Sequence, residues 1–305
     1  MSPQPQPTES AERRNAADAW IEAMRLRTLP VSVAGVILAI AYAFLYGEFR
    51  ATPAILCLTF AILAQIASNF ANEYYDFREG LDSPGREGPR RGVTEGDITP
   101  RAMLLATYGT LAAACAVGCS LIPYGGWWLI PVGALIAAGV VAYSTGPYPL
   151  SHHGLGEVAV ILFFGIIPVC LTFYLQAGFC PPAVIAGSVA AGLMGANVLI
   201  VNNYRDADDD RAVGKRTLAV IIGPRFMPRL YTLNSIGAYA LLTTLYLPIS
   251  SYSGLGVVSL YLFGSYYISL QMPRRRGRAL TPLLGMTAVA MLATCAALAI
   301  IAAIG

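Results

Sequence analysis

Apolar residues form long, nearly uninterrupted runs along this chain, and polar residues gather between them. A run of about 20 mostly apolar residues is long enough for an α-helix to cross the roughly 30 Å hydrocarbon layer of a membrane. The runs follow neither the alternation of a half-buried strand nor the period of an amphipathic helix. We therefore predict an all-α polytopic membrane protein. Its nine predicted transmembrane helices cover residues 29–47, 53–72, 102–122, 127–145, 156–177, 183–202, 227–248, 254–271 and 281–303.

Composition supports this fold class. Of the 305 residues, 56% are hydrophobic and 12% are charged, whereas soluble domains carry about 25% charged residues. An ordinary soluble domain is therefore excluded. The basic residues lie between the apolar runs, so nucleic-acid binding is not expected. Residues 1–18 are polar and are predicted to form a disordered cytosolic tail, which leaves residues 19–305 as a single transmembrane domain.

The basic residues also predict an orientation in the membrane. With nine helices, 19 of the 20 Lys and Arg residues fall on one side, and only Arg50 falls on the other. Loops rich in Lys and Arg stay in the cytoplasm. The amino terminus and the two long loops, at about residues 73–101 and 203–226, are therefore expected to be cytoplasmic.

Two similar polar motifs follow the second and sixth predicted helices. Asn72 precedes Asp76 by four residues, Asn202 precedes Asp206 by four, and Asp210 follows four residues later. Residues four apart share a helix face, so each set points in one direction if its helix continues past the apolar run. Clustered side-chain oxygens suit Mg²⁺, and the absence of neighbouring His or Cys argues against zinc or iron. The motifs predict a magnesium site.

Basic residues are interleaved with these acids. Carboxylates alone would repel a polyanion, but Mg²⁺ together with Arg and Lys can bind a diphosphate group. Arg78, Lys215 and Arg216 are the candidates for direct contact. The alternative is that these residues only set the membrane orientation.

These motifs resemble the UbiA superfamily of intramembrane aromatic prenyltransferases, and most closely its 1,4-dihydroxy-2-naphthoate polyprenyltransferase branch. The resemblance extends from residue 20 to about residue 223, and beyond that only the hydropathy is similar. Glu73 is a departure, since Asp is usual at that position. The matching segments are Trp20–Pro30, Asn72–Asp82, Gly88–Gly92, Leu155–Gln176 and Asn202–Leu218.

The resemblance implies a nine-helix bundle around a central cavity that opens to lipid, with cap loops on the cytoplasmic side of the bacterial inner membrane. It also implies transfer of a polyprenyl group from polyprenyl diphosphate to 1,4-dihydroxy-2-naphthoate. Diphosphate and CO₂ would be released, giving demethylmenaquinone in menaquinone biosynthesis. Neither the prenyl length nor the oligomeric state follows from the sequence.

The resemblance assigns roles to residues as well. Asp76 and Asp206 would be central to catalysis with Arg78, Lys215 and Arg216. An allylic cation needs electron-rich faces, and an Arg would hold the carboxylate of the acceptor. The implied Mg²⁺ ligands are Asn72, Asp76, Asp82, Asn202, Asp206 and Asp210. The substrate candidates are Arg27, Tyr74, Arg91, Tyr143 and Tyr148.

Several alternatives stay open from the sequence. The acceptor could be a hydroxybenzoate or a homogentisate. A cation transporter is disfavoured, because it would need ionisable residues near the bilayer midplane, and the predicted spans carry essentially none. Phosphatidyl-alcohol transfer requires a differently spaced Asp motif that is absent. His152 and His153 could serve as a base, although a solvated loop pair is the simpler interpretation.

Overall fold

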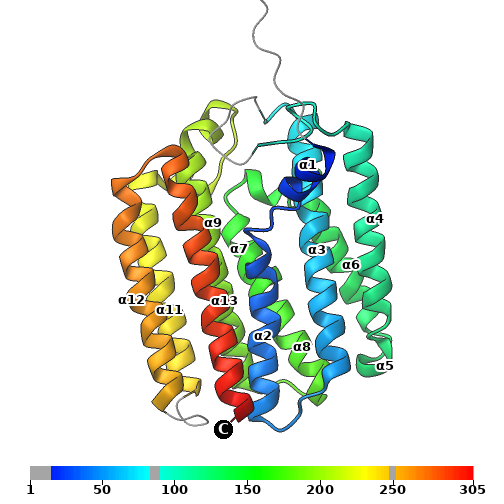
Figure 1. Ribbon diagram of the computed structural model, residues 1–305, viewed down its shortest axis with the longest axis vertical. Coiled ribbons are helices and arrows are strands. Elements are labelled where there is room, and N and C mark those ends of the chain that lie inside the picture. The colour runs from blue at the N-terminus through cyan, green and yellow to red at the C-terminus, as the bar shows by residue number, and fades with distance from the viewer. Residues whose placement is uncertain (1–14, 83–89, 247–251, 305) are drawn as a thin grey trace, which may run out of the picture.

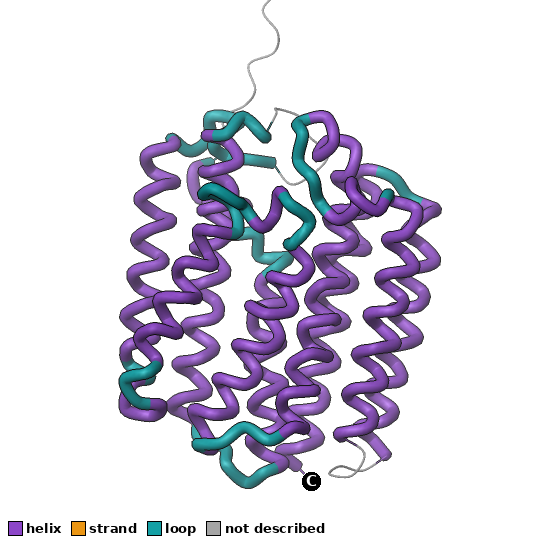
Figure 2. The backbone as a smooth tube through the Cα atoms, turned by 180° about the vertical axis from the view of Figure 1, so that it is seen from behind, coloured by secondary structure: helices purple, strands orange, loops and turns teal. Residues whose placement is uncertain are grey.

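The structure is a computed structural model that describes residues 15–82, 90–246 and 252–304. Within these residues it is a bundle of helices without strands (Figures 1 and 2). A π-helical segment, Ile161–Ile166, joins α7 to α8. The α-helices are α1 (Ala16–Ala23), α2 (Leu29–Leu45), α3 (Ala51–Arg78), α4 (Pro100–Cys119), α5 (Ile122–Gly125), α6 (Leu129–Ala142), α7 (Gly156–Val160), α8 (Ile167–Ala177), α9 (Pro182–Ala212), α10 (Leu218–Ile222), α11 (Met227–Tyr246), α12 (Tyr252–Gln271) and α13 (Thr281–Ile304).

Helices coincide with each of the nine predicted apolar stretches. Six helical segments in the described residues are long and apolar enough to cross a membrane, namely those at 51–78, 100–119, 156–177, 182–212, 252–274 and 277–304. The apolar helices α2 and α6 are shorter, so the count of nine spans stays a prediction. Helices α3 and α9 run to Arg78 and Ala212, so both continue past their apolar runs.

The amino-terminal segment is partly helical. Residues 1–14 of the predicted tail lie outside the described residues, whereas α1 begins at Ala16, within the range expected to be disordered. The Asn15 side chain accepts a hydrogen bond from the backbone N–H of Ala17, a common way to begin a helix. Trp20 packs against Phe70 on α3 with ring centroids 5.5 Å apart. These contacts fix α1 over one end of the bundle (Figure 1).

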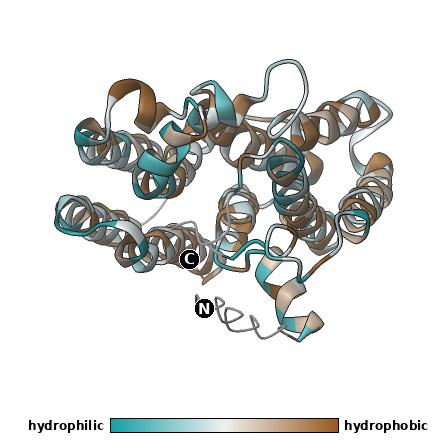
Figure 3. Cartoon of the chain, turned by 90° about the horizontal axis from the view of Figure 1, so that it is seen from above, coloured by the Kyte–Doolittle hydropathy of each residue, from teal (hydrophilic) through white to brown (hydrophobic). Residues whose placement is uncertain are grey.

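Close helix packing organises the bundle around α9. Helix α13 packs along α2, α4 along α3, and α11 along α9. A Cβ atom on Gly165 would lie only 2.4 Å from the Cα of Gly192, so this crossing of the π-helical segment with α9 requires glycine. Hydrophobic residues dominate the helices seen along their axes (Figure 3). The packing leaves a central cavity of about 1180 Å³ among α1, α2, α3, α7 and α9.

Candidate active site

The central cavity is polar at the end of the bundle that carries α1. Its wall there includes Asn72 on α3, together with Asn202, Asp206 and Asp210 on α9. Lys215, which follows α9, completes this wall. Because α3 and α9 extend beyond their apolar runs, the two polar motifs meet at the same end of the cavity. The structure thus brings together the residues that the sequence predicted would share a site.

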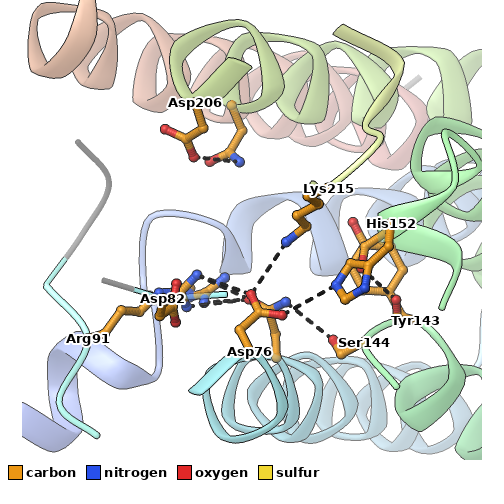
Figure 4. Close-up of polar contacts among 12 residues, drawn as sticks. Asp76, Asp82, Arg91, Tyr143, Ser144, His152, Asp206 and Lys215 are labelled. Carbon is orange, nitrogen blue, oxygen red and sulfur yellow. Dashed lines mark hydrogen bonds and ion pairs between the residues drawn. The ribbon is translucent and has the colours of Figure 1, made fainter. Parts of the chain in front are cut away.

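Asp76 lies at the centre of a cluster of cationic and potentially cationic groups on the α3 side (Figure 4). Its side chain is 1% exposed. Lys215 Nζ donates to Asp76 Oδ2 at 3.5 Å, and Arg91 Nη2 lies 3.8 Å from the same oxygen. The other oxygen, Oδ1, lies 3.6 Å from His152 Nε2. His152 therefore belongs to the site and is not merely a solvated loop residue.

Two guanidinium groups converge on the amide oxygen of Asn72. Arg25 Nη2 donates to Asn72 Oδ1 at 2.7 Å, and Arg91 Nη2 does so at 3.3 Å. Arg91 Nε also lies 3.2 Å from Asp82 Oδ2. Arg91 thus contacts both Asn72, the first residue of the first motif, and Asp82, the last. The amide nitrogen of Asn72 donates to Ser144 Oγ at 3.3 Å. In this geometry Asn72 orients Arg25 and Arg91.

Arg25 was absent from the candidates chosen from the sequence. Among the described residues, Arg25 is the one non-glycine residue with a positive φ, at 51°. This backbone conformation is uncommon for residues other than Gly, Asn and Asp. This turn directs the guanidinium from the segment after α1 into the cavity wall. Arg25 lies in the segment Trp20–Pro30, which resembles the family. That resemblance was the signal in the sequence that could have identified Arg25 as a site residue.

The α9 side of the site is held by Arg205. Its Nε donates to Asp206 Oδ1 at 2.6 Å and its Nη2 donates to Asp206 Oδ2 at 2.8 Å. Nη2 also donates to Asn202 Oδ1 at 2.8 Å. This bidentate pair fixes the plane of the Asp206 carboxylate. Figure 4 shows Asp76 and Asp206 on facing helices, with Lys215 between them.

The site fits a magnesium ion that arrives together with a phosphate-bearing ligand. Within the described residues, no three acidic, His or Cys side chains form a ready-made metal cluster. Mg²⁺ commonly uses one or two carboxylates and completes its shell with waters and substrate phosphates. Asp76 Oδ1 is buried without a hydrogen bond, and Asp206 faces it from α9. These hard oxygen donors suit Mg²⁺.

Not every predicted residue faces the cavity. Asp76 and Asp82 are not in its wall, although Arg91, which pairs with both, is. Arg27 and Tyr143 line it. Arg78 is exposed, with its guanidinium carbon 5.7 Å from the Tyr75 ring centroid, and the side chain of Arg216 is exposed. Tyr74 and Tyr148 are likewise not in the cavity wall: Tyr74 packs edge-on against Tyr75, and Tyr148 stacks on His153 at 3.8 Å.

The segment from Arg90 to Ile98 is braced against α3. Glu73 Oε1 accepts a hydrogen bond from the backbone N–H of Val93 at 3.1 Å, so this acid holds the loop that carries Arg91. Arg90 donates to Asp97 at 2.8 Å, which raises the pKa of the Arg90 guanidinium above its ordinary value. Residues 88 and 89 of the Gly88–Gly92 motif lie outside the described residues.

Comparisons with known proteins show the family to which the chain belongs. Residues 29–284 match the UbiA prenyltransferase family. The chain is 40% identical over 211 residues to the 1,4-dihydroxy-2-naphthoate octaprenyltransferase of Escherichia coli (strain K12), covering 67% of this chain and 68% of that protein. It is 34% identical over 275 residues to the enzyme of the same name from Mycobacterium leprae (strain TN), covering 89% and 92%.

A solved structure has the same fold. It is a UbiA homolog from Archaeoglobus fulgidus bound to DMAPP and Mg²⁺, with a TM-score of 0.64 and 17% sequence identity. The match covers 92% of this chain and 99% of that one. The apolar helices and the family match together identify an integral membrane protein.

Proposed function

Since the chain belongs to the UbiA prenyltransferase family, we propose that it transfers a polyprenyl group from polyprenyl diphosphate to 1,4-dihydroxy-2-naphthoate. The products are the reduced, quinol form of demethylmenaquinone, diphosphate and CO₂, and the reaction is a step of menaquinone biosynthesis. The observation that carries this proposal is that Asp76 and Asp206, from two separate motifs, lie on facing helices with Lys215 between them, beside a large cavity that Asp206 and Lys215 line. The naphthoate enzymes of Escherichia coli and Mycobacterium leprae are the relatives that support the choice of acceptor.

The basic groups around the cavity would bind the diphosphate. Lys215, Arg25 and Arg91 are held near its polar end by Asp76 and Asn72. Asp76 and Asp206 would hold Mg²⁺, with Asp82 and Asp210 nearby in the two motifs. Bound Mg²⁺ supplies positive charge that stabilises the departing diphosphate as the allylic C–O bond breaks. Lys215 and Arg91 then exchange their carboxylate partners for phosphate oxygens, so diphosphate binding rearranges existing ion pairs.

The rest of the cavity would hold the two organic groups. Val31, Val160 and Phe164 form apolar parts of its wall, where an isoprenoid chain would avoid water. Exclusion of water matters, because water would capture an allylic cation. Tyr143 on the cavity wall offers an electron-rich ring to that cation. Arg27 lines the same cavity and would attract the acceptor carboxylate.

The membrane arrangement forms part of the proposal. Nine helices would span the bacterial inner membrane in one domain from residue 19 onward, with the cavity open sideways to lipid. The amino terminus and the loops after α3 and α9 would cap the cytoplasmic side, since 19 of the 20 basic residues fall on that side of a nine-helix arrangement.

A product assay tests the function. Purified protein in detergent is incubated with a polyprenyl diphosphate, Mg²⁺ and one of three acceptors: 1,4-dihydroxy-2-naphthoate, 4-hydroxybenzoate or homogentisate. We expect mass spectrometry to show prenylated, decarboxylated product with the naphthoate alone, and none after EDTA is added. Prenylation of 4-hydroxybenzoate in preference to the naphthoate would contradict the assigned acceptor. Undiminished turnover in EDTA would contradict the role of the metal.

A further inference from the structure

Glu157 is a buried acid in the cavity wall that the diphosphate site does not use. It is the second residue of α7 and is 6% exposed. It lines the same cavity as Asn202 and Lys215 but lies outside both polar motifs. A carboxylate this deeply buried is rare unless it is paired. Its contacts therefore bear on its role.

The two carboxylate oxygens of Glu157 differ in their hydrogen bonding. Asn203 Nδ2 donates to Oε1 at 2.8 Å, so the side chain is fixed to α9. Oε2 is buried and has no hydrogen-bond partner among the described residues. A buried polar atom without a partner lowers the stability of a fold, and a catalytic role is one explanation for keeping such an atom.

The surroundings of Glu157 differ from those of Asp76 and Asp206. Those two acids face Lys215 and Arg205 at hydrogen-bonding distance. No cation in the described part of the chain forms an ion pair with Glu157, and its partner Asn203 is a neutral amide. A cation beside a carboxylate makes that carboxylate a weaker proton acceptor. Glu157 has no cationic partner among the described residues, so its carboxylate is not weakened in this way.

The position of Glu157 places it beside the reacting groups. Asn203, which holds it, is the immediate neighbour of Asn202 on α9, and Asp206 follows one turn later. Tyr143 borders the same part of the cavity, because a Cβ atom on Gly156 would lie 3.5 Å from the Tyr143 hydroxyl. Glu157 and Tyr143 both line the cavity. An aromatic ring bound there would lie next to the diphosphate site.

We propose that Glu157 Oε2 accepts a hydrogen bond from a ring hydroxyl of the aromatic acceptor and then takes its proton. This inference rests on the proposed function. The hydroxyl O–H bond breaks, its proton moves to Oε2, and its oxygen becomes a carbonyl oxygen. A ring π-electron pair forms the new C–C bond at the carbon that bears the carboxylate, while the allylic C–O pair leaves with diphosphate.

Decarboxylation then returns the proton. The C–C bond to the carboxylate breaks and CO₂ leaves. The electron pair of that bond restores the aromatic ring, and the carbonyl oxygen recovers its proton from Glu157. The enzyme ends in its starting protonation state, so one carboxylate at this position serves both half-steps. A general base of this kind contributes about 10²–10⁴-fold to a rate.

The Glu157→Gln variant tests this role. Its amide oxygen can still accept the hydrogen bond from Asn203, so the link from α7 to α9 is kept while the proton acceptor is lost. We expect kcat to fall at least about 100-fold, with an unchanged melting temperature and unchanged binding of a Mg²⁺–polyprenyl thiodiphosphate analogue. Glu48→Gln, the same change at the opposite end of the bundle, is the matched control and should retain wild-type kcat. Turnover of Glu157→Gln within about threefold of wild type would overturn the proposal.

A second measurement uses the unaltered protein and does not depend on folding of a variant. The acceptor in which the hydroxyl beside the carboxylate is methylated cannot give up that proton. We expect it to bind but react at least about 100-fold more slowly, and equal turnover of the methyl ether would overturn the proposal. If the wild-type chain does not prenylate the parent naphthoate, the proposed function fails. If the wild-type chain prenylates the naphthoate and Glu157→Gln does so at a similar rate, the proposed function stands and only the role of Glu157 fails.

Discussion

Replacing Arg91 with Gln removes a cation that faces two buried acids. Arg91 lies 3.2 Å from Asp82 and 3.8 Å from Asp76, and its side chain is 7% exposed. At an effective dielectric constant of about 20, these contacts correspond to gross attractions of about 5 and about 4 kcal/mol. Desolvation offsets much of this, and removing one partner of a buried pair typically costs 3–5 kcal/mol. We therefore expect Arg91→Gln to lose about 3 kcal/mol of stability without metal.

Magnesium should partly reverse this loss. With Arg91 gone, Asp82 and Asp76 face each other with less positive charge between them, so a divalent cation gains affinity for the site. Thermal unfolding in detergent, followed with and without Mg²⁺, should show a larger stabilisation by the metal in Arg91→Gln than in wild type.

The adjacent residue provides the control. Arg90 pairs with Asp97, and its side chain is 30% exposed, so Arg90→Gln should lose less than about 1 kcal/mol and respond to Mg²⁺ as wild type does. Equal stabilities for the two variants, or an Arg91→Gln protein indifferent to Mg²⁺, would refute the electrostatic account of this site.

Four further substitutions probe the packing and the site. Gly165→Ala places a Cβ atom 2.4 Å from the Gly192 backbone and should lower stability by about 1–3 kcal/mol. Gly133→Ala meets nothing within 4 Å and should be neutral or slightly stabilising in the same thermal assay. Asp206→Asn should lose at least about 100-fold in turnover while circular dichroism stays unchanged, and normal activity would remove Asp206 from the site. Arg78→Gln should change kcat less than about threefold, because Arg78 lies at the exposed end of α3, and a large loss would place Arg78 in the diphosphate site.

Hydropathy alone predicted most of the fold, because membrane spans must satisfy their backbone groups internally as helices. The positions of the apolar helices were predictable, whereas the extension of α3 and α9 past their apolar runs was only a condition for each polar motif to share a face. The crossing at Gly165 and Gly192 depends on a contact between segments distant in sequence. The π-helical turn at 161–166 likewise has no clear local signal. The short lengths of α2 and α6 also differ from the predicted runs.

The site was predicted in part. The Asn-x-x-x-Asp spacing identified Asp76 and Asp206, because a helix repeats a face every four residues. It could not show that Arg25 turns into the cavity, since that depends on an uncommon backbone conformation. Arg78 was chosen as a cation interleaved with the acids, and Tyr148 as an electron-rich ring for the allylic cation, yet both side chains are exposed. Glu157 was not among the candidates chosen from the sequence, because its burial against Asn203 is a tertiary contact.

The most direct test of the central claim follows the carboxylate carbon. The wild-type chain is supplied with 1,4-dihydroxy-2-naphthoate carrying ¹³C in its carboxyl group, a polyprenyl diphosphate and Mg²⁺. Labelled CO₂, diphosphate and prenylated product are then counted together. The account predicts equal amounts of all three, with no label in the product. Release of diphosphate without labelled CO₂, or a prenylated product that keeps the label, would contradict it.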